Sequence, residues 1–337
     1  MNEIRVLNNE VVMANLNMAD AISAVEQAYS LNSNKEVNLF TTVFYDFEVG
    51  KSDLDIKSGT IDKAGIFGFK LTTLFGDNPK IGLEPLIGTM MIYDRATGCP
   101  IALLNASHIT GMRTGAAGGI GVKYLARKDS ENLLLVGCGG QAPFQLAATL
   151  SLMENIKKVS IFDPISYENA ADFSGKIKNM MEQKFLSKFN AEYIPVSDVE
   201  KATREADVII TITPSRKPII MKEWVKRGTH LTCIGADMEG KQEIDENLFQ
   251  VAGVFTDDIE KTSKVGEMET AIKKGIFKKE DIVCEIGDVI QKKNAGRLSY
   301  DEITIFDASG LAALDLLSAK ILLDKAAKLD LGTIIKL

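Results

Sequence analysis

The segment Leu133–Gln145, LLLVGCGGQAPFQ, most constrains what this chain can fold into. A short apolar run leads into a glycine-rich turn, and a helix-competent run begins at Gln141. An apolar run bounded by glycines is typical of a buried parallel strand. Glycines at its end permit a tight turn and let bare backbone approach a ligand. A helix that starts there directs free N–H groups and the positive end of its dipole at the turn, where a phosphate binds well.

This turn is a variant of the dinucleotide-binding turn. Gly137-x-Gly139 is present, and Ala142 stands where the third glycine is usual. Structural turns also contain glycine pairs, so a second signal is needed. Asp163 supplies it, because it ends another apolar run at about the spacing where an acidic residue meets the ribose hydroxyls of NAD. Pro164 leaves no arginine directly after it for a 2′-phosphate, so the sequence predicts NAD rather than NADP.

The second half of the chain repeats short apolar runs separated by helical stretches, which predicts βαβ units and a parallel sheet. We expect an α/β fold whose C-terminal domain is a Rossmann-like, doubly wound parallel sheet. The expected strands are Leu133–Val136, Lys158–Phe162, Val208–Thr213 and His230–Ile234, with Val254–Asp257 and Glu302–Phe306 as further candidates.

The first third differs, because its expected strands lack long helices between them. It predicts an N-terminal α+β domain with an antiparallel or mixed sheet, on which an amphipathic C-terminal helix at Leu311–Leu329 packs. Glycines in a helix at Ile109–Leu125 indicate close backbone packing, since each costs about 1 kcal/mol relative to alanine. The other expected elements are a helix at Met18–Leu31 with Asn17 as its cap, strands at Asn38–Phe47, Ile66–Leu74, Thr89–Tyr93 and Ile101–Leu104, and a turn at Asp94–Pro100.

Composition excludes several classes of function. With 45% hydrophobic and 25% charged residues, the 337-residue chain is typical of a soluble globular protein of two domains. A net charge of −7 argues against a nucleic-acid partner. The four cysteines are far apart, without a C-x-x-C pair, so neither a metal site nor disulfides are expected. No secretory signal or membrane-spanning run is evident, which predicts a cytoplasmic protein without a membrane partner.

Three charged residues are candidates for chemistry, each with a structural alternative. Lys70 interrupts an apolar strand and either faces solvent or faces a pocket, where it binds a carboxylate. Arg113 forms either a surface salt bridge or a bidentate contact with a carboxylate or phosphate. Asp237 follows a strand at its carboxyl end, where doubly wound sheets bind ligands. It is either a turn former or a proton acceptor.

Other polar residues near these positions give weaker signals. His108 is expected to be structural. Thr211 and Thr213 end a strand that borders the cofactor in sheets of this kind, although threonines are also ordinary at strand ends. Lys241 and Glu243 either pair with each other or order the loop that contains Asp237.

Taken together, these stretches resemble the ornithine cyclodeaminase/mu-crystallin family. The matching segments are GFK at 68–70, GLEPLIG from Gly82, DRATGCPIALLNASHITGMRTGAA from Asp94, VGCGGQAPFQ, GADMEGKQEID and FDASGLAALDLLSA. They occur in the family's order and cover nearly the whole chain. The resemblance implies a nicotinamide-dependent homodimer. Residues 1–128, completed by the C-terminal helix 311–337, would bind substrate and dimerise, and residues 129–310 would bind NAD.

The resemblance also implies roles for individual residues. Lys70 and Arg113 match substrate-carboxylate ligands, and Asp237 matches the catalytic acid/base, with Lys70 counted as catalytic as well. Gly140 and Gln141 match the pyrophosphate turn. From pattern and resemblance together, the expected cofactor contacts are Arg113, Gly137, Gly139, Gly140, Gln141, Asp163, Thr211, Thr213, Lys241, Ala308 and Ser309.

Two departures from the family bear on the substrate. Cyclodeaminases of this family use a further arginine upstream of Lys70, but this chain has no arginine between Arg5 and Arg95. Lys57 lies near the position of an acidic substrate-binding residue. A cation there favours a substrate with a second negative group, so Lys57 is a candidate substrate ligand.

Three functions are consistent with these residues. The first is an NAD-dependent oxidoreductase that acts on a small amino acid or imino acid through an imine. The second is a redox-neutral, ornithine-type cyclodeaminase that releases ammonia and recycles its NAD. The third is a non-catalytic protein of mu-crystallin type that binds nicotinamide or another small ligand. Net NADH production distinguishes the first from the second, and intact Lys70, Arg113 and Asp237 argue against the third.

Overall fold

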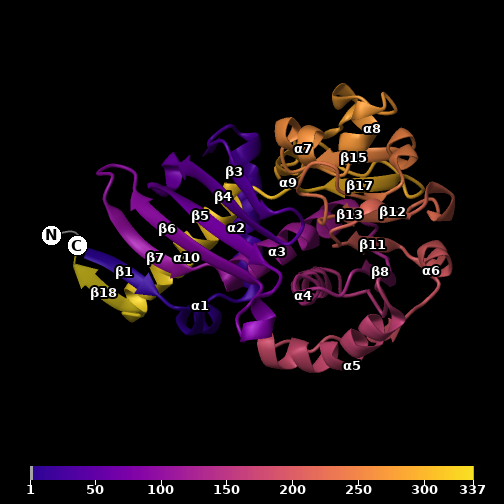
Figure 1. Ribbon diagram of the computed structural model, residues 1–337. Coiled ribbons are helices and arrows are strands. Elements are labelled where there is room, and N and C mark those ends of the chain that lie inside the picture. The colour runs from indigo at the N-terminus through magenta and orange to yellow at the C-terminus, as the bar shows by residue number, and fades with distance from the viewer. Residues whose placement is uncertain (1–2, 337) are drawn as a thin grey trace. The chain divides into compact units, whose positions relative to one another are not determined.

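The computed structural model describes residues 3–336, which form two compact units (Figure 1). The first unit comprises residues up to 113 together with those from 311 onward, and the second comprises residues 114–310. The division falls after Arg113, inside helix α3 (Ser107–Leu125). The sequence instead placed the domain boundary at the charged stretch 127–131.

Glycines explain why most of α3 groups with the second unit. A Cβ on Gly119 would lie 2.8 Å from the Cβ of Ala148, and side chains at neighbouring glycines would meet Phe144 and Gln145. Those residues belong to α4 (Ala142–Leu152). The two helices therefore approach at backbone distance, which confirms the close packing expected from the glycines.

The first unit contains a mixed sheet in the order β18-β1-β7-β6-β5-β4-β2, with β3 also on β4. β1 and β7 are parallel, and the other pairs are antiparallel. The strand expected at 38–47 is wrong as a single element. It forms two strands, and both pair with β4. The sequence analysis did not predict β4. The bounds are β1 (Glu3–Leu7), β2 (Asn38–Leu39), β3 (Val43–Glu48), β4 (Ser52–Ile61), β5 (Ile66–Phe75), β6 (Leu86–Asp94), β7 (Pro100–Asn105) and β18 (Thr333–Lys336).

Helices α1 (Asn9–Asn15), α2 (Met18–Ser33) and α10 (Ala312–Leu329) complete the first unit. Asn17 caps α2 as expected, and Asp20 closes a capping box with it. α10 packs against α2, β4 and β5 of the same unit. Side chains alternate across the sheet, so β5 presents one face to these helices and the other outward.

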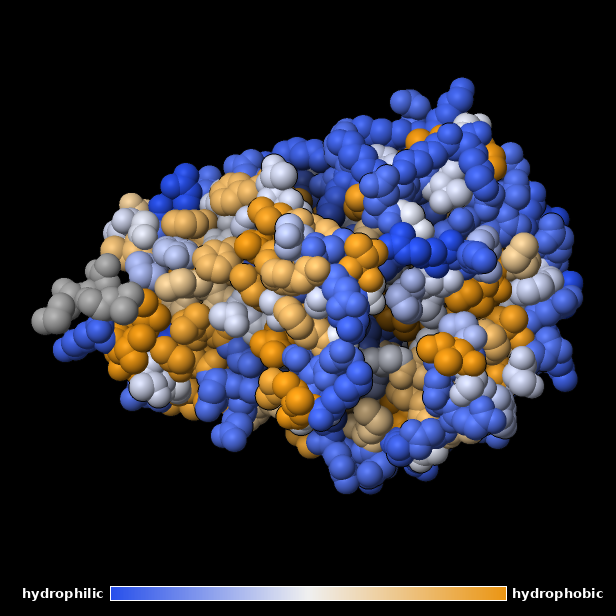
Figure 2. Space-filling model, in the orientation of Figure 1, coloured by the Kyte–Doolittle hydropathy of each residue, from blue (hydrophilic) through white to orange (hydrophobic). Residues whose placement is uncertain are grey.

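The outer face of this sheet is apolar. Phe67, Phe69 and Leu71 alternate with the buried positions of β5, and Phe67 stacks on Tyr93 with ring centroids 4.9 Å apart. Exposed aromatic side chains continue on β3, where Tyr45 is 59% exposed. Figure 2 shows hydrophobic residues gathered over the region where Figure 1 places β5–β7. An apolar surface of this kind is typical of an interaction site.

The second unit contains an all-parallel sheet in the order β10-β9-β8-β11-β13-β17-β15-β16. When only the strands of this sheet are numbered, the order begins 3-2-1-4-5, as in Rossmann folds. The predicted Rossmann-like sheet is therefore confirmed. The bounds are β8 (Asn132–Val136), β9 (Lys158–Phe162), β10 (Glu192–Pro195), β11 (Val208–Thr211), β13 (His230–Cys233), β15 (Ala252–Thr256), β16 (Cys284–Glu285) and β17 (Ile303–Asp307).

The remaining elements of the second unit lie around this sheet, and two of them form a separate two-stranded sheet (Figure 1). They are α4, α5 (Tyr167–Lys184), α6 (Val199–Glu205), α7 (Ile259–Val265), α8 (Glu269–Lys273), α9 (Ile286–Ile290), and the parallel pair β12 (Arg216–Ile220) and β14 (Gln242–Ile244). Strand residues such as Leu134, Ile209 and Leu231 form its buried core. Within residues 3–336, no helix combines the length and apolarity needed to cross a membrane.

Candidate active site

The glycine turn follows β8 and precedes α4. Gly137 has φ +107°, and a Cβ there would lie 2.8 Å from the carbonyl oxygen of Ile212, so only glycine fits without strain. A Cβ on Gly139 or Gly140 would meet nothing within 4 Å. Bare backbone at these two positions therefore faces open space beside the N-terminus of a helix, as a pyrophosphate site requires.

Asp163 is fixed beside this turn. Its Oδ2 accepts a hydrogen bond from the backbone N–H of Cys138 at 3.3 Å, and its Oδ1 accepts one from the Asn169 amide at 3.0 Å. Burial raises the pKa of Asp163, but hydrogen bonds from Asn169 and from backbone N–H groups outweigh it and hold the pKa below its usual value. An ionised carboxylate next to exposed glycine backbone is the pair of features that NAD would need.

At the ends of β11 and β13, a buried carboxylate binds the two candidate threonines. The hydroxyls of Thr211 and Thr213 both donate to Glu243 at 2.8 Å. The pairing considered between Lys241 and Glu243 is wrong, because Lys241 Nζ instead lies 2.6 Å from Asp237 Oδ1. The alternative, that Glu243 orders the loop, agrees with these bonds. The roles of both threonines as cofactor contacts stay predictions.

Asp237 lies in the loop that follows β13. Its side chain is 42% exposed, and the Lys241 side chain that pairs with it is 16% exposed. The carboxylate is thus held by a cation of its own loop and remains accessible to solvent. A carboxylate in this position can accept a proton from a bound amine.

Ala308 and Ser309 follow β17, the neighbour of β13. The Ala308 N–H donates to the carbonyl of Cys233 at 3.1 Å, and the Ser309 carbonyl accepts from Lys261 Nζ at 3.3 Å. The structure therefore places the expected second-unit residues at the carboxyl ends of parallel strands. That edge of a doubly wound sheet is where ligands bind.

In the first unit, Lys70 and Arg113 converge on one buried carboxylate. Lys70 Nζ and Arg113 Nε each lie 3.0 Å from Asp315 Oδ1, and Lys70 is only 2% exposed. Neither the solvent-facing lysine nor the surface salt bridge considered from the sequence is present. Lys70 points to the inner face because the apolar side chains of β5 face outward. Lys57 is the cross-strand partner of Lys70 on β4 and is also buried.

Lys57, Lys70 and Arg113 form a buried cation cluster, and burial and neighbouring charges set the protonation of Lys70 within it. Burial lowers the pKa of Lys70 to about 7, helped by the charges of Arg113 and Lys57 and opposed by that of Asp315. Burial raises the pKa of Asp315, but Arg113 and Lys70 outweigh it and lower the pKa overall. With Lys70 protonated, the three cations outnumber Asp315 and Asp55, the 3.5 Å partner of Lys57, by one positive charge, which suits a ligand carboxylate.

Asp315 is a site residue that sequence reasoning missed. It lies on α10 in the apolar run LAALDLLSA and is 1% exposed. An acidic residue at a buried position of an amphipathic helix needs a cation, and that requirement was the available signal.

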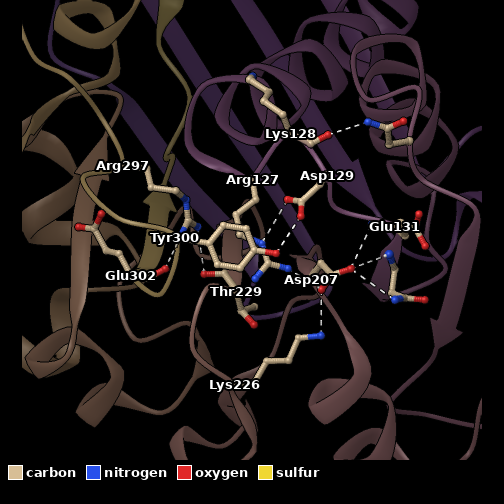
Figure 3. Close-up of polar contacts among 12 residues, drawn as sticks. Arg127, Lys128, Asp129, Glu131, Asp207, Lys226, Thr229, Arg297, Tyr300 and Glu302 are labelled. Atoms are coloured by element: carbon tan, nitrogen blue, oxygen red, sulfur yellow. Dashed lines mark hydrogen bonds and ion pairs between the residues drawn. The ribbon is translucent and has the colours of Figure 1, made fainter.

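A second polar cluster lies at the amino ends of the parallel strands (Figure 3). Arg127 and Lys226 each lie 2.9 Å from Asp207, and Arg127 also stacks on Tyr300. Asp207 accepts hydrogen bonds from the backbone that leads into β8. These bonds tie the stretch 127–131 to the second unit, which explains why the chain does not divide there.

The part of the chain that the structure describes was also searched for a metal-binding site. Residues 3–336 contain no group of three or more His, Cys, Asp or Glu side chains placed to hold an ion. Both histidines, His108 and His230, are buried. Hydroxyls of Thr232 and Thr304 lie 2.8 and 2.9 Å from the His230 ring nitrogens, and burial holds its pKa well below the usual value.

Comparison with known proteins finds relatives that match almost the whole chain. The model of the ornithine cyclodeaminase/mu-crystallin family matches residues 2–329. An alanine dehydrogenase from Archaeoglobus fulgidus is 37% identical over 99% of this chain and 98% of its own length.

Solved structures with bound nucleotide are also similar. An archaeal alanine dehydrogenase dimer with bound NAD has a TM-score of 0.89 at 36% identity and covers 99% of both chains. The Δ1-pyrroline-2-carboxylate reductase of Thermococcus litoralis, in complex with NADH and L-proline, has a TM-score of 0.89 at 27% identity. That match covers 98% of this chain and 99% of the other. This chain therefore belongs to the ornithine cyclodeaminase/mu-crystallin family.

Proposed function

We propose that this chain is an NAD-dependent oxidoreductase that transfers hydride at the Cα of a small amino acid or imino acid. The observation that carries the proposal is the buried cation cluster, in which Lys70 and Arg113 share Asp315 and retain excess positive charge. A carboxylate is the group that every amino acid offers to such cations. The relatives named alanine dehydrogenase and pyrroline-2-carboxylate reductase support this class of substrate.

The cofactor in this proposal is NAD, which supplies a hydride acceptor. Gly137 to Gln141 would hold its pyrophosphate, and Asp163 its ribose hydroxyls. The negative charge of Asp163 disfavours a 2′-phosphate, which is why NAD is preferred over NADP. The residues proposed for further contacts, in addition to Arg113, are Thr211, Thr213, Lys241, Ala308 and Ser309.

The first proposed task of the protein is orientation. Lys70 and Arg113 bind the substrate carboxylate, so that the Cα–H bond points in one direction. Lys57 adds a further positive charge, which favours a substrate with a second carboxylate.

The second task is proton transfer. Asp237 accepts a proton from the substrate ammonium, because the amine must be neutral before hydride leaves Cα. Loss of hydride gives an iminium ion. Asp237 then positions a water molecule that attacks the iminium carbon, and the products are a keto acid and ammonia. The same groups acting in reverse reduce an imine.

A panel of substrates tests this proposal. Amino acids with one or two carboxylates are incubated with NAD, and keto acids are incubated with ammonia and NADH. We expect NADH to accumulate with at least one amino acid, in step with ammonia. Ammonia released without net NADH would instead identify a cyclodeaminase. Tight NADH binding without turnover across the panel would identify a binding protein.

We further propose that the protein is a homodimer that pairs through the apolar outer face of the first unit's sheet. That face carries Phe67, Phe69 and Leu71, and the similar archaeal alanine dehydrogenase is a dimer. Sedimentation of the wild type should give a dimer, and Phe69→Glu should give a monomer, because it places a charge among buried apolar groups. A monomeric wild type would contradict this. A cytoplasmic location stays a prediction.

A further inference from the structure

One fully buried carboxylate joins three segments at the carboxyl edge of the second unit's sheet. Glu243 Oε2 accepts from the Thr211 hydroxyl at 2.8 Å and from the Gly235 N–H at 2.9 Å. Its Oε1 accepts from the Thr213 N–H at 2.6 Å and from the Thr213 hydroxyl at 2.8 Å. Both oxygens therefore accept two hydrogen bonds each.

These bonds fix both ends of one loop. Gly235 begins the segment 235–242 after β13, and Glu243 directly follows it on β14. Asp237 lies inside that segment. The carboxylate of Glu243 thus ties the start of the loop to its end, and through Thr211 and Thr213 it ties both to the end of β11.

A second buried carboxylate, Glu267, fixes the backbone of Glu243. Glu267 Oε1 accepts from the backbone N–H groups of Glu243 and Ile244, each at 2.6 Å. The backbone that carries the Glu243 side chain is therefore fixed as well. A buried carboxylate is costly unless its lone pairs are satisfied, and here four donors satisfy them.

We propose that Glu243 is a positioning residue that fixes the loop 235–242 and, through it, the carboxylate of Asp237. The inference rests on the proposed function, in which Asp237 exchanges a proton with the substrate amine. Glutamine has nearly the same shape as glutamate but offers one accepting oxygen instead of two. In Glu243→Gln, the amide nitrogen would face donors, and the loop would lose anchors.

Hydrogen exchange tests the anchoring without reference to activity. We expect amide exchange across residues 235–242 to speed up about tenfold or more in Glu243→Gln, because lost anchors let the loop open. Glu239→Gln is the matched control, since Glu239 lies in the same loop and its 77% exposed side chain pairs with Lys273. Exchange should match the wild type in this control. Unchanged exchange in Glu243→Gln would overturn the proposal.

A milder variant covers the case in which Glu243→Gln does not fold. Thr211→Val removes one donor and keeps the Glu243 carboxylate, with its bonds to Gly235 and Thr213. Exchange across 235–242 should then rise by an intermediate amount. Exchange equal to the wild type in Thr211→Val would also count against the anchoring.

Kinetics test whether Glu243 acts through Asp237. We expect Glu243→Gln to lower kcat about 10- to 100-fold, because a small misplacement of a reacting group is costly. The far-UV circular dichroism of Glu243→Gln should match that of the wild type, which a general loss of structure would not allow. The double variant Glu243→Gln/Asp237→Asn should be no slower than Asp237→Asn alone.

Additive losses in that cycle would overturn the proposal, since they would show that Glu243 acts independently of Asp237. Failure of the proposed function is recognised separately. If the wild type oxidises no amino acid, the function fails, and the exchange experiment still decides whether Glu243 anchors the loop.

Discussion

Each unit of this protein contains a buried cluster of charged side chains, and the two clusters are stabilised in opposite ways. The first surrounds a single carboxylate, Asp315, with the cation cluster. The second buries Glu243, Glu267 and Asp307, whose hydrogen bonds come from backbone N–H groups and, for Glu243, threonine hydroxyls. Opposite charge compensates the first cluster, and oriented dipoles compensate the second.

This difference shows how one physical cause gives two chemical outcomes. Burial disfavours the charged form of any group, so it lowers the pKa of Lys70 to about 7 and raises the pKa of Glu243 to about 7. A buried lysine and a buried glutamate thus approach neutrality from opposite sides. Each unit contains a group that changes protonation in the pH range where enzymes work.

Removing the central carboxylate should give the largest effect on stability. Asp315→Asn leaves Lys70 and Arg113 buried without a counter-charge, and we expect a loss of about 3–5 kcal/mol in the free energy of unfolding. Urea denaturation measures it. Asp324→Asn on the same helix is the control, because Asp324 is 55% exposed and pairs only at the surface. A loss below about 1 kcal/mol in Asp315→Asn would show that the cations do not depend on this carboxylate.

Removing one cation should affect activity more than stability. Lys70→Met keeps most of the buried apolar stem, and Arg113 remains to pair with Asp315. We expect kcat/KM for the amino acid to fall at least about 100-fold, equal to roughly 2.7 kcal/mol. Lys80→Met, at a 75% exposed lysine, should leave kcat/KM unchanged. Retained activity in Lys70→Met would exclude this lysine from substrate binding.

The two clusters should respond to pH with opposite signs. The Lys70 pKa falls from 10.5 in the unfolded chain to about 7, so the unfolded chain binds more protons between these values and unfolding free energy rises with pH. The Glu243 pKa rises from 4.5 to about 7, so the folded chain binds more protons there and unfolding free energy falls as pH rises.

Variants separate these two contributions, each at most about 1.4 kcal/mol per pH unit. Relative to the wild type, Lys70→Met should make the rise in unfolding free energy above pH 7 less steep. Glu243→Gln should make the fall below pH 7 less steep, while the other buried carboxyl groups, Glu267 and Asp307, keep their own contribution. Chemical denaturation across this range checks both. If the contributions of Lys70 and Glu243 to the unfolding free energy changed with pH in the same direction, the predicted opposite pH dependence would be wrong.

Asp163 is a partly exposed carboxylate that, like Glu243, accepts hydrogen bonds from uncharged donors. Asp163→Asn keeps an accepting oxygen but removes the charge, so repulsion of a 2′-phosphate should fall. We expect the ratio of NADP to NAD affinity to rise about tenfold, or roughly 1.4 kcal/mol. Binding titrations with NADPH and NADH measure it, with the exposed Asp172→Asn as control. An unchanged ratio would mean that another residue sets the preference.

The sequence predicted those features that local spacing determines. The glycine turn and Asp163 are 25 residues apart and belong to one βαβ unit, so their pattern sufficed to place them together. The glycines of α3 likewise indicated close backbone packing, although the sequence did not identify α4 as the partner helix. The Rossmann-like sheet followed from regular alternation of strands and helices.

Features that depend on distant parts of the chain were harder to predict. Lys70 and Asp315 are 245 residues apart, and which face of β5 is buried depends on α10. The pattern of β5 alone therefore left the direction of Lys70 open, and Asp315 was missed. Glu243 is 32 residues from Thr211, so the sequence could not decide whether Glu243 pairs with Lys241 or orders the loop.

The proposed oxidation of an amino acid by NAD is tested most directly by following the hydrogen at Cα. The amino acid selected by the substrate panel is supplied with deuterium at Cα, and the NADH formed is analysed by mass spectrometry together with the ammonia released. We expect deuterium in the NADH and one NADH for each ammonia. Ammonia without deuterated NADH would contradict the proposed oxidation at Cα.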